Sequence, residues 1–141
     1  MAKTRYRGEQ GTATLFVLGL CVAVLFIGGL SVDFWRLIAA RRSLAAMADA
    51  AATAGANGLD EASLRAGGKD LDPNLAHDLA ADSLVDAEAN VRIATSTIDA
   101  TIQSVDVVLT QRVNFTFLSL LSDDDGLVVR VSARAAPQRI G

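Results

Sequence analysis

An uncharged run over residues 11–32 dominates the N-terminal part of this sequence. At about 1.5 Å per residue, a helix of this length is roughly 33 Å long, enough to cross a hydrocarbon core about 30 Å thick. Its apolar side chains occupy the whole circumference, whereas a surface helix of a soluble protein keeps them on one stripe. We therefore predict a transmembrane helix over residues 11–32, preceded by a basic cytoplasmic tail over residues 1–10.

Two export signals compete with a permanent membrane span. A cleaved signal peptide has a core of about 7 to 15 apolar residues before a small-residue cleavage site. The run here is longer and continues into Asp33 and Arg36 without a turn-forming break. A lipoprotein signal needs a small residue before the acylated cysteine, and Leu20 precedes Cys21. Both signals are disfavoured, and Cys21 is interpreted as a small apolar residue of the span.

Basic residues flank the predicted span on both sides, so the positive-inside rule gives almost no preference for either orientation. The two sets are Lys3, Arg5 and Arg7 before the span and Arg36, Arg41 and Arg42 after it. A short tail is easily retained, and the C-terminal body carries most of the acidic residues, which favours a cytoplasmic N-terminus and an extracytoplasmic body. Phe34 and Trp35 then form an aromatic anchor at the outer interface, and Asp33 is expected to be solvated by water there.

Composition narrows the classes of partner and cofactor. The net charge is −3, from 13 basic and 16 acidic residues, and no dense Lys/Arg cluster combines with exposed aromatic residues. Nucleic acid is therefore not an expected partner. A single cysteine allows no internal disulfide, and no Cys/His spacing predicts zinc. The residues after the span suffice for one small domain, and no cofactor is predicted.

Beyond the span, small and apolar residues recur at alternating spacings of three and four. They are Leu37, Ala40, Leu44, Met47, Ala51 and Ala54. This heptad-type seam predicts that the helix continues outside the membrane over residues 33–57. Gly55, Asn57 and Gly58 are expected to stop it by turning the chain left-handed. The seam either covers a sheet of the same domain or packs in addition against other subunits.

The remaining residues, 58–141, predict a small α+β extracytoplasmic domain with a second helix and an antiparallel, pilin-like sheet. A polar loop over residues 59–71 carries one helical turn at residues 61–65. The second helix begins at Pro73, with Asp72 as its N-cap.

Alternating apolar residues then predict three strands, followed by a frayed C-terminus. The first contains Val91, Ile93 and Thr95, the second Ile102, Val105, Val107 and Leu109, and the last Leu127, Val129, Val131 and Ala133. A turn is expected at residues 99–100 and a bulge near Ser104. Phe115, Phe117, Leu118, Leu120 and Leu121 predict a short helix or loop packed onto the sheet.

Two segments carry a resemblance to a known family. In residues 32–44, Asp33 is followed by Arg36, Arg41 and Arg42. Residues 47–56 read Met-Ala-Asp-Ala-Ala-Ala-Thr-Ala-Gly-Ala. With the span they closely resemble the N-terminal region of TadE/TadG-like Flp pilus assembly proteins. The match is best over residues 11–56, and the closing strand at residues 129–136 is more weakly similar. The family-motif and packing residues are Asp33, Arg36, Arg41, Leu44, Met47, Asp49, Ala51 and Gly55.

The resemblance implies a minor, pseudopilin-like accessory component of the tight-adherence machine, which assembles type IV-related pili. Its partners would be other pilus assembly proteins and membrane lipid, with a homo- or hetero-oligomer formed through the N-terminal helix. Processed pilins of this class are cut after a glycine, with a glutamate five residues beyond the cut. Here Gly8 would place Ala13 at that position, and Gly11 would place Phe16. Either the leader stays as an uncut anchor, which we favour, or it is cut elsewhere.

Residues with reactive side chains do not assemble into a recognisable site. His77 lies beside Asp78 without a nucleophile at a useful spacing, so a solvated helix residue is expected and no enzyme is predicted. Residues 123–125 are three aspartates without the spaced ligands of a calcium loop, which favours a hydrated turn. The alternative function is a membrane-tethered extracytoplasmic sensor or binding module. A pocket with convergent polar groups would favour it over an assembly role.

Overall fold

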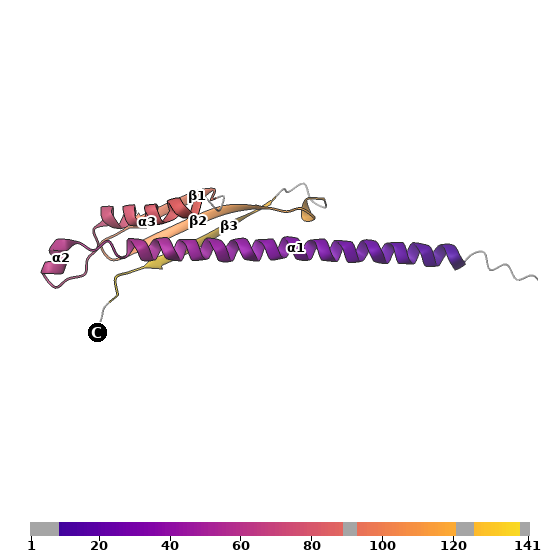
Figure 1. Ribbon diagram of the computed structural model, residues 1–141, viewed down its shortest axis with the longest axis horizontal. Helices are drawn as coiled ribbons and strands as arrows, with labels where there is room; N and C mark the ends of the chain where they lie inside the picture. The colour runs from indigo at the N-terminus through magenta and orange to yellow at the C-terminus, as the bar shows by residue number, and fades with distance from the viewer. Residues whose placement is uncertain (1–8, 89–92, 121–125, 139–141) are drawn as a thin grey trace, which may run out of the picture.

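The computed structural model of the protein describes residues 9–88, 93–120 and 126–138. The elements are α1 (Glu9–Gly55), α2 (Glu61–Arg65), α3 (Pro73–Glu88), β1 (Thr95–Ala100), β2 (Val105–Asn114), the 3-10 turn η1 (Leu118–Leu120) and β3 (Gly126–Ala135). The strands form one antiparallel sheet in the order β1-β2-β3. The sheet and α3 lie alongside the C-terminal half of α1 (Figure 1). The predicted α+β fold with a long N-terminal helix is therefore confirmed.

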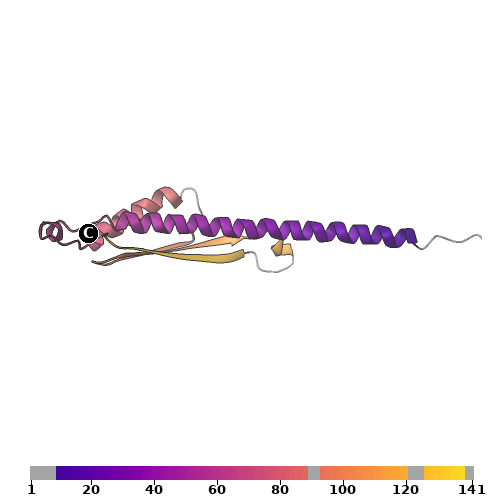
Figure 2. The same cartoon turned by 90° about the horizontal axis from the view of Figure 1, so that it is seen from below.

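The environment of α1 changes at Gly29. Residues 11–28 are all exposed, whereas from Gly29 onward one face of the helix is buried. By length and composition α1 can cross a membrane, with a mean hydropathy of 2.7 over its most apolar 18-residue window. Figure 2 shows the exposed half projecting from the rest of the molecule as a straight continuation of the packed half. The exposed half is thus the part of the chain suited to be a membrane anchor.

The predicted seam packs within the same chain. Leu44 and Ala51 are fully buried, and Leu37, Ala40 and Met47 are partly buried against the same core. Alternate residues of β2 and β3 point toward α1, and α3 packs against α1 and β1. The other core residues include Ala48, Leu71, Ala76, Ala80, Leu84, Val105, Val107 and Leu109. The intramolecular interpretation of the seam is confirmed. Burial of this apolar surface is the main term that holds the head, which we define as the described residues of 58–138, against the packed half of α1.

α1 ends at Gly55, two residues before the predicted limit of 57 and at the first residue of the predicted stop, but the reason for its glycines differs from the prediction. Among the described residues only Gly67 has a positive φ, +78°, so the chain does not turn left-handed at Gly55 or Gly58. Instead, both glycines allow α3 to approach. A Cβ on Gly55 would lie 2.9 Å from the Ala76 carbonyl oxygen, and one on Gly58 would lie 2.7 Å from the Ala76 nitrogen.

The two predicted starts of short helices are confirmed by their caps. Asp60 accepts a hydrogen bond from the Ser63 amide at 2.8 Å, which begins the single-turn helix α2. Asp72 Oδ1 accepts one from the Asn74 amide at 2.9 Å, immediately before α3 begins at Pro73. A side-chain acceptor at this position satisfies an amide that has no partner within its own helix.

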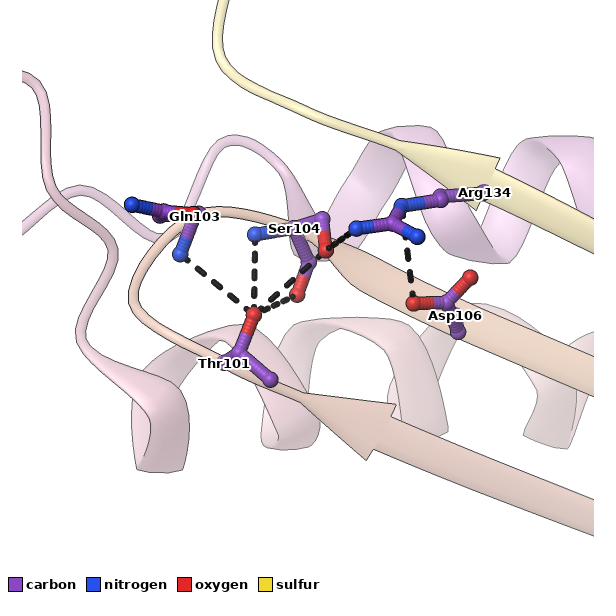
Figure 3. A network of polar contacts seen from close by, with 5 residues as sticks. All are labelled: Thr101, Gln103, Ser104, Asp106 and Arg134. Atoms are coloured by element: carbon purple, nitrogen blue, oxygen red, sulfur yellow. Dashed lines mark hydrogen bonds and ion pairs between the residues drawn. The ribbon is translucent and has the colours of Figure 1, made fainter.

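The β1–β2 turn lies later than predicted. Residues 99–100 belong to β1 and pair with the start of β2. The chain turns at residues 101–104, because Thr101 Oγ1 accepts a hydrogen bond from the Ser104 amide at 3.1 Å and donates one to the Ser104 carbonyl at 2.9 Å (Figure 3). Ile102 is consequently in the turn and 56% exposed, and the predicted bulge near Ser104 is replaced by an unbroken pairing register.

The closing strand follows the predicted alternation from Val129 onward, whereas Leu127 at its start is 48% exposed. Val129 and Ala133 of β3 are buried, whereas Val128, Arg130 and Arg134 face away from α1. Arg134 also fastens the β1–β2 turn, since its Nη2 donates to Ser104 Oγ at 2.9 Å (Figure 3). The predictions for Val91, Leu121, residues 123–125 and residues 139–141 fall outside the described residues.

Candidate functional site

Asp33 lies on the buried face of α1, and the residue is 2% exposed. Its carboxylate accepts hydrogen bonds from three consecutive backbone amides. Oδ2 receives the Phe117 amide at 2.7 Å and the Leu118 amide at 2.9 Å, and Oδ1 receives the Thr116 amide at 3.1 Å. One carboxylate on the long helix therefore holds the segment that follows β2.

The local fold of that segment explains why a carboxylate binds there. β2 ends at Asn114, and η1 begins at Leu118. The amides at the start of such a short turn have no acceptor within the turn, so an external oxygen must satisfy them. A carboxylate is a strong acceptor because its charge shortens and strengthens each bond. Phe117 of the apolar stretch after β2 packs against α1 here, and not onto the sheet as predicted.

The expectation that water solvates Asp33 is wrong. Protein amides surround the carboxylate, and they replace the hydration that it loses on burial. Arg36, one turn further along α1, is exposed and donates from Nη1 to Thr116 Oγ1 at 2.7 Å. The Asp33 and Arg36 side chains thus hold the same short segment.

The electrostatic environment of Asp33 favours its charged form. Burial raises the pKa of Asp33, but the hydrogen bonds from the Leu118, Thr116 and Phe117 amides and the charge of Arg36 lower it. The net result is a pKa below the ordinary value of 3.8. Hydrogen bonds donated to a carboxylate stabilise its ionised state, so the net direction follows from the geometry.

Gly29 completes the contact one turn before Asp33. The Phe117 ring occupies the space beside Gly29, and a Cβ at that position would collide with the ring. Residues four apart lie on the same face of a helix, so Gly29 and Asp33 both face residues 116–118. Gly29 gives the Phe117 ring room to pack, and Asp33 accepts the hydrogen bonds of the amides. We call this set of Gly29, Asp33, Arg36 and residues 116–118 the clasp.

The structure separates the predicted family-motif residues into three groups. Asp33 and Arg36 meet in the clasp. Leu44, Met47, Ala51 and Gly55 lie in or against the core between α1, α3 and the sheet. Arg41 and Asp49 are exposed on α1 and reach neither group. Sequence reasoning did not identify Gly29, Thr116 or Phe117 as partners of Asp33, although a glycine four residues before the aspartate was a usable signal.

The other polar groups do not form a reactive constellation in the part of the chain that the structure describes. His77 Nδ1 lies 3.6 Å from Asp78 Oδ1, with both side chains more than half exposed. No group of three or more His, Cys, Asp or Glu side chains in residues 9–88, 93–120 and 126–138 is arranged to hold a metal ion. A shallow, mainly apolar hollow lies on the exposed half of α1 and is lined by Ala13, Thr14, Val17, Leu18 and Cys21.

Fold and clasp together define a small α+β head fixed to the side of a helix whose free half is apolar. Residues 11–68 match the family model described as "Putative Flp pilus-assembly TadE/G-like". This match confirms the resemblance inferred from the residues, and it identifies the N-terminal part of the chain, through α2, as a TadE/G-like segment. The chain matches no curated protein and no solved structure. The family and the apolar helix support a component of Flp pilus assembly with a membrane anchor.

Proposed function

We propose that the protein is a minor, pseudopilin-like accessory component of Flp pilus assembly that works by packing against other assembly proteins. The observation that carries this proposal is the division of α1 at Gly29 inside the family-matched segment. One half is apolar and exposed, and the other is built into a small head. In the proposed arrangement the N-terminus is cytoplasmic, the exposed half lies in the membrane, and the head is extracytoplasmic.

The outer face of the packed half of α1 supports a packing role. Arg42, Ala46, Asp49 and Thr53 are exposed at spacings of four, three and four, so they form a stripe opposite the buried seam. Small side chains let another helix approach closely, and the two charges favour a partner with complementary charges. Within the described residues, neither Arg42 nor Asp49 has an intrachain ion pair.

The stripe can be tested by charge reversal in cells that make Flp pili. Asp49→Arg is expected to reduce the number of pili seen by electron microscopy, while the amount of protein in the membrane fraction stays unchanged. Asp78→Arg is the matched control, because Asp78 is also an exposed aspartate on a helix, with 79% of its side chain accessible. If Asp49→Arg, Asp78→Arg and the wild type made equal numbers of pili, the stripe would not be the packing surface.

The anchor is tested separately by removing it. Deletion of residues 11–28 leaves the packed half of α1 and the head intact, so the protein should move from the membrane fraction to the soluble fraction and piliation should be lost. Replacing the same residues by an unrelated apolar span should restore membrane attachment. Normal pili in the deletion strain would contradict the proposed function.

A further inference from the structure

We propose that the η1 turn, with Phe117 and Leu118, lies in the lipid interface of the membrane that α1 crosses, so that the head rests directly on the bilayer. The partner surface is the bilayer itself, at the level where acyl chains meet headgroups. This inference rests on the membrane anchorage of α1 contained in the proposed function, but not on a role in pili.

The length of the exposed half of α1 leaves no spacer between membrane and head. Residues 11–28 are the stretch of α1 that is exposed on every side, and these 18 residues span about 27 Å at about 1.5 Å per residue. A bilayer has a hydrocarbon core about 30 Å thick. If the stretch fills that core, Gly29 is located at its outer boundary. The first contact between α1 and the head is therefore at the membrane surface.

The clasp fixes the η1 turn at that level. Phe117 packs beside Gly29, and Asp33 binds the amides of residues 116–118. Gly29 and Asp33 are one turn apart, about 6 Å along the axis, which is close to the thickness of about 5–7 Å that remains for each headgroup layer. The figures agree with this placement, since η1 lies beside α1 beyond the membrane-proximal end of the strands (Figures 1 and 2).

The exposed side chains at this level suit an interface. Phe117 is 38% and Leu118 37% exposed, although they belong to the segment that binds α1. Phe34 and Trp35, on the other sides of α1 at the same height, are 63% and 69% exposed. Aromatic side chains concentrate where a membrane meets water, and lipid would cover apolar surface that otherwise faces solvent. Together the four residues surround the helix where the apolar stretch ends.

Tryptophan fluorescence in vesicles tests the placement, because Trp35 is the only tryptophan. The full chain is reconstituted in phosphatidylcholine vesicles as three variants, each carrying Trp35→Phe and one new tryptophan. Phe117→Trp reports on the η1 turn, Val24→Trp on the outer half of the span within the hydrocarbon core, and Ile102→Trp on the opposite end of the sheet. Ile102 is the matched control, since it is an exposed apolar residue, at 56%, in the β1–β2 turn.

Lipids brominated near the headgroup are expected to quench the Phe117→Trp variant several-fold more than the Ile102→Trp variant, with a blue-shifted emission for the former. Lipids brominated deep in the acyl chains should quench Val24→Trp most. An unquenched tryptophan at position 117 beside a quenched one at position 24 would overturn this inference and leave the anchor standing. A blue-shifted but unquenched emission at position 117 would mean that protein covers the turn. If position 24 is unquenched as well, the anchor and the inference both fail.

Discussion

Asp33 and Phe117 are joined by a 2.7 Å hydrogen bond from the Phe117 amide to Oδ2, although 84 positions separate them in the sequence. The bond belongs to the clasp, which holds the connection after β2 against α1 one turn beyond Gly29. Because both residues stand where the exposed half of α1 ends, the clasp sets how far along the helix the head reaches. The carboxylate at this boundary therefore has a structural role in positioning the head.

Replacing the Asp33 carboxylate is expected to destabilise the clasp. Asp33→Ala leaves three amides without their acceptor, and Asp33→Asn keeps one acceptor oxygen but loses the charge that strengthens each bond. The melting temperature of the detergent-solubilised protein should fall in both, more in Asp33→Ala. Asp49→Asn, on the exposed face of the same helix, is the control and should melt like the wild type. Equal melting of all four proteins would show that the clasp does not contribute to stability.

The lowered pKa of Asp33 gives a pH dependence with a definite sign. The folded pKa lies below the ordinary value of 3.8, so the unfolded chain binds this proton more readily. The stabilisation is complete well above that value and is lost as the pH falls through the folded pKa. The difference in melting temperature between wild type and Asp33→Asn should thus be constant near neutral pH and shrink below about pH 4. A difference that grew on acidification would contradict the lowered pKa.

Elements that depend on local patterns could be predicted from the sequence. The span of α1, its end at Gly55, the Asp72 cap and the alternation of β3 each rest on residues close together in the chain. The β1–β2 turn was misplaced because aspartate is common in turns, which drew the prediction to residues 99–100. The Thr101 hydroxyl, which bonds both the amide and the carbonyl of Ser104, decides the actual position.

The clasp could not be predicted in the same way. Asp33 binds main-chain amides, which every residue but proline has, so no side-chain pattern marks its partners. An aspartate at the end of an apolar run has a simple explanation as a solvated boundary residue, and that explanation was wrong. Water is excluded from the Asp33 carboxylate only because a segment distant in the sequence packs on Gly29. The stripe through Asp49 shows the converse, since its exposure was foreseeable from the seam, whereas no sequence pattern identifies the partner that we propose for it.

Adding a methyl group at Gly29 should displace the η1 turn. A Cβ there would collide with the Phe117 ring, whereas a Cβ at Gly28 has no neighbour within 4 Å. Gly29→Ala is therefore expected to speed amide exchange at residues 116–118, measured by hydrogen–deuterium exchange. Gly28→Ala is the matched control and should leave exchange unchanged, with a helix favoured by roughly 1 kcal/mol. Removing the ring by Phe117→Ala in the Gly29→Ala background should restore the packing of the η1 turn on α1. If Gly29→Ala did not alter amide exchange, the ring would move aside freely.

Truncation of Leu44 tests whether the seam of α1 supports the head. Leu44 is 0% exposed at the centre of the helix face that meets the sheet, so Leu44→Ala leaves a cavity and loses apolar contact. Such a truncation costs about 2–5 kcal/mol in the free energy of unfolding. Leu64→Ala is the control, because Leu64 on α2 is 45% exposed and a surface change of this kind stays within about 0.5 kcal/mol. Urea denaturation in detergent measures both. A Leu44→Ala protein as stable as the control would mean that packing of the Leu44 side chain does not contribute to the stability of the head.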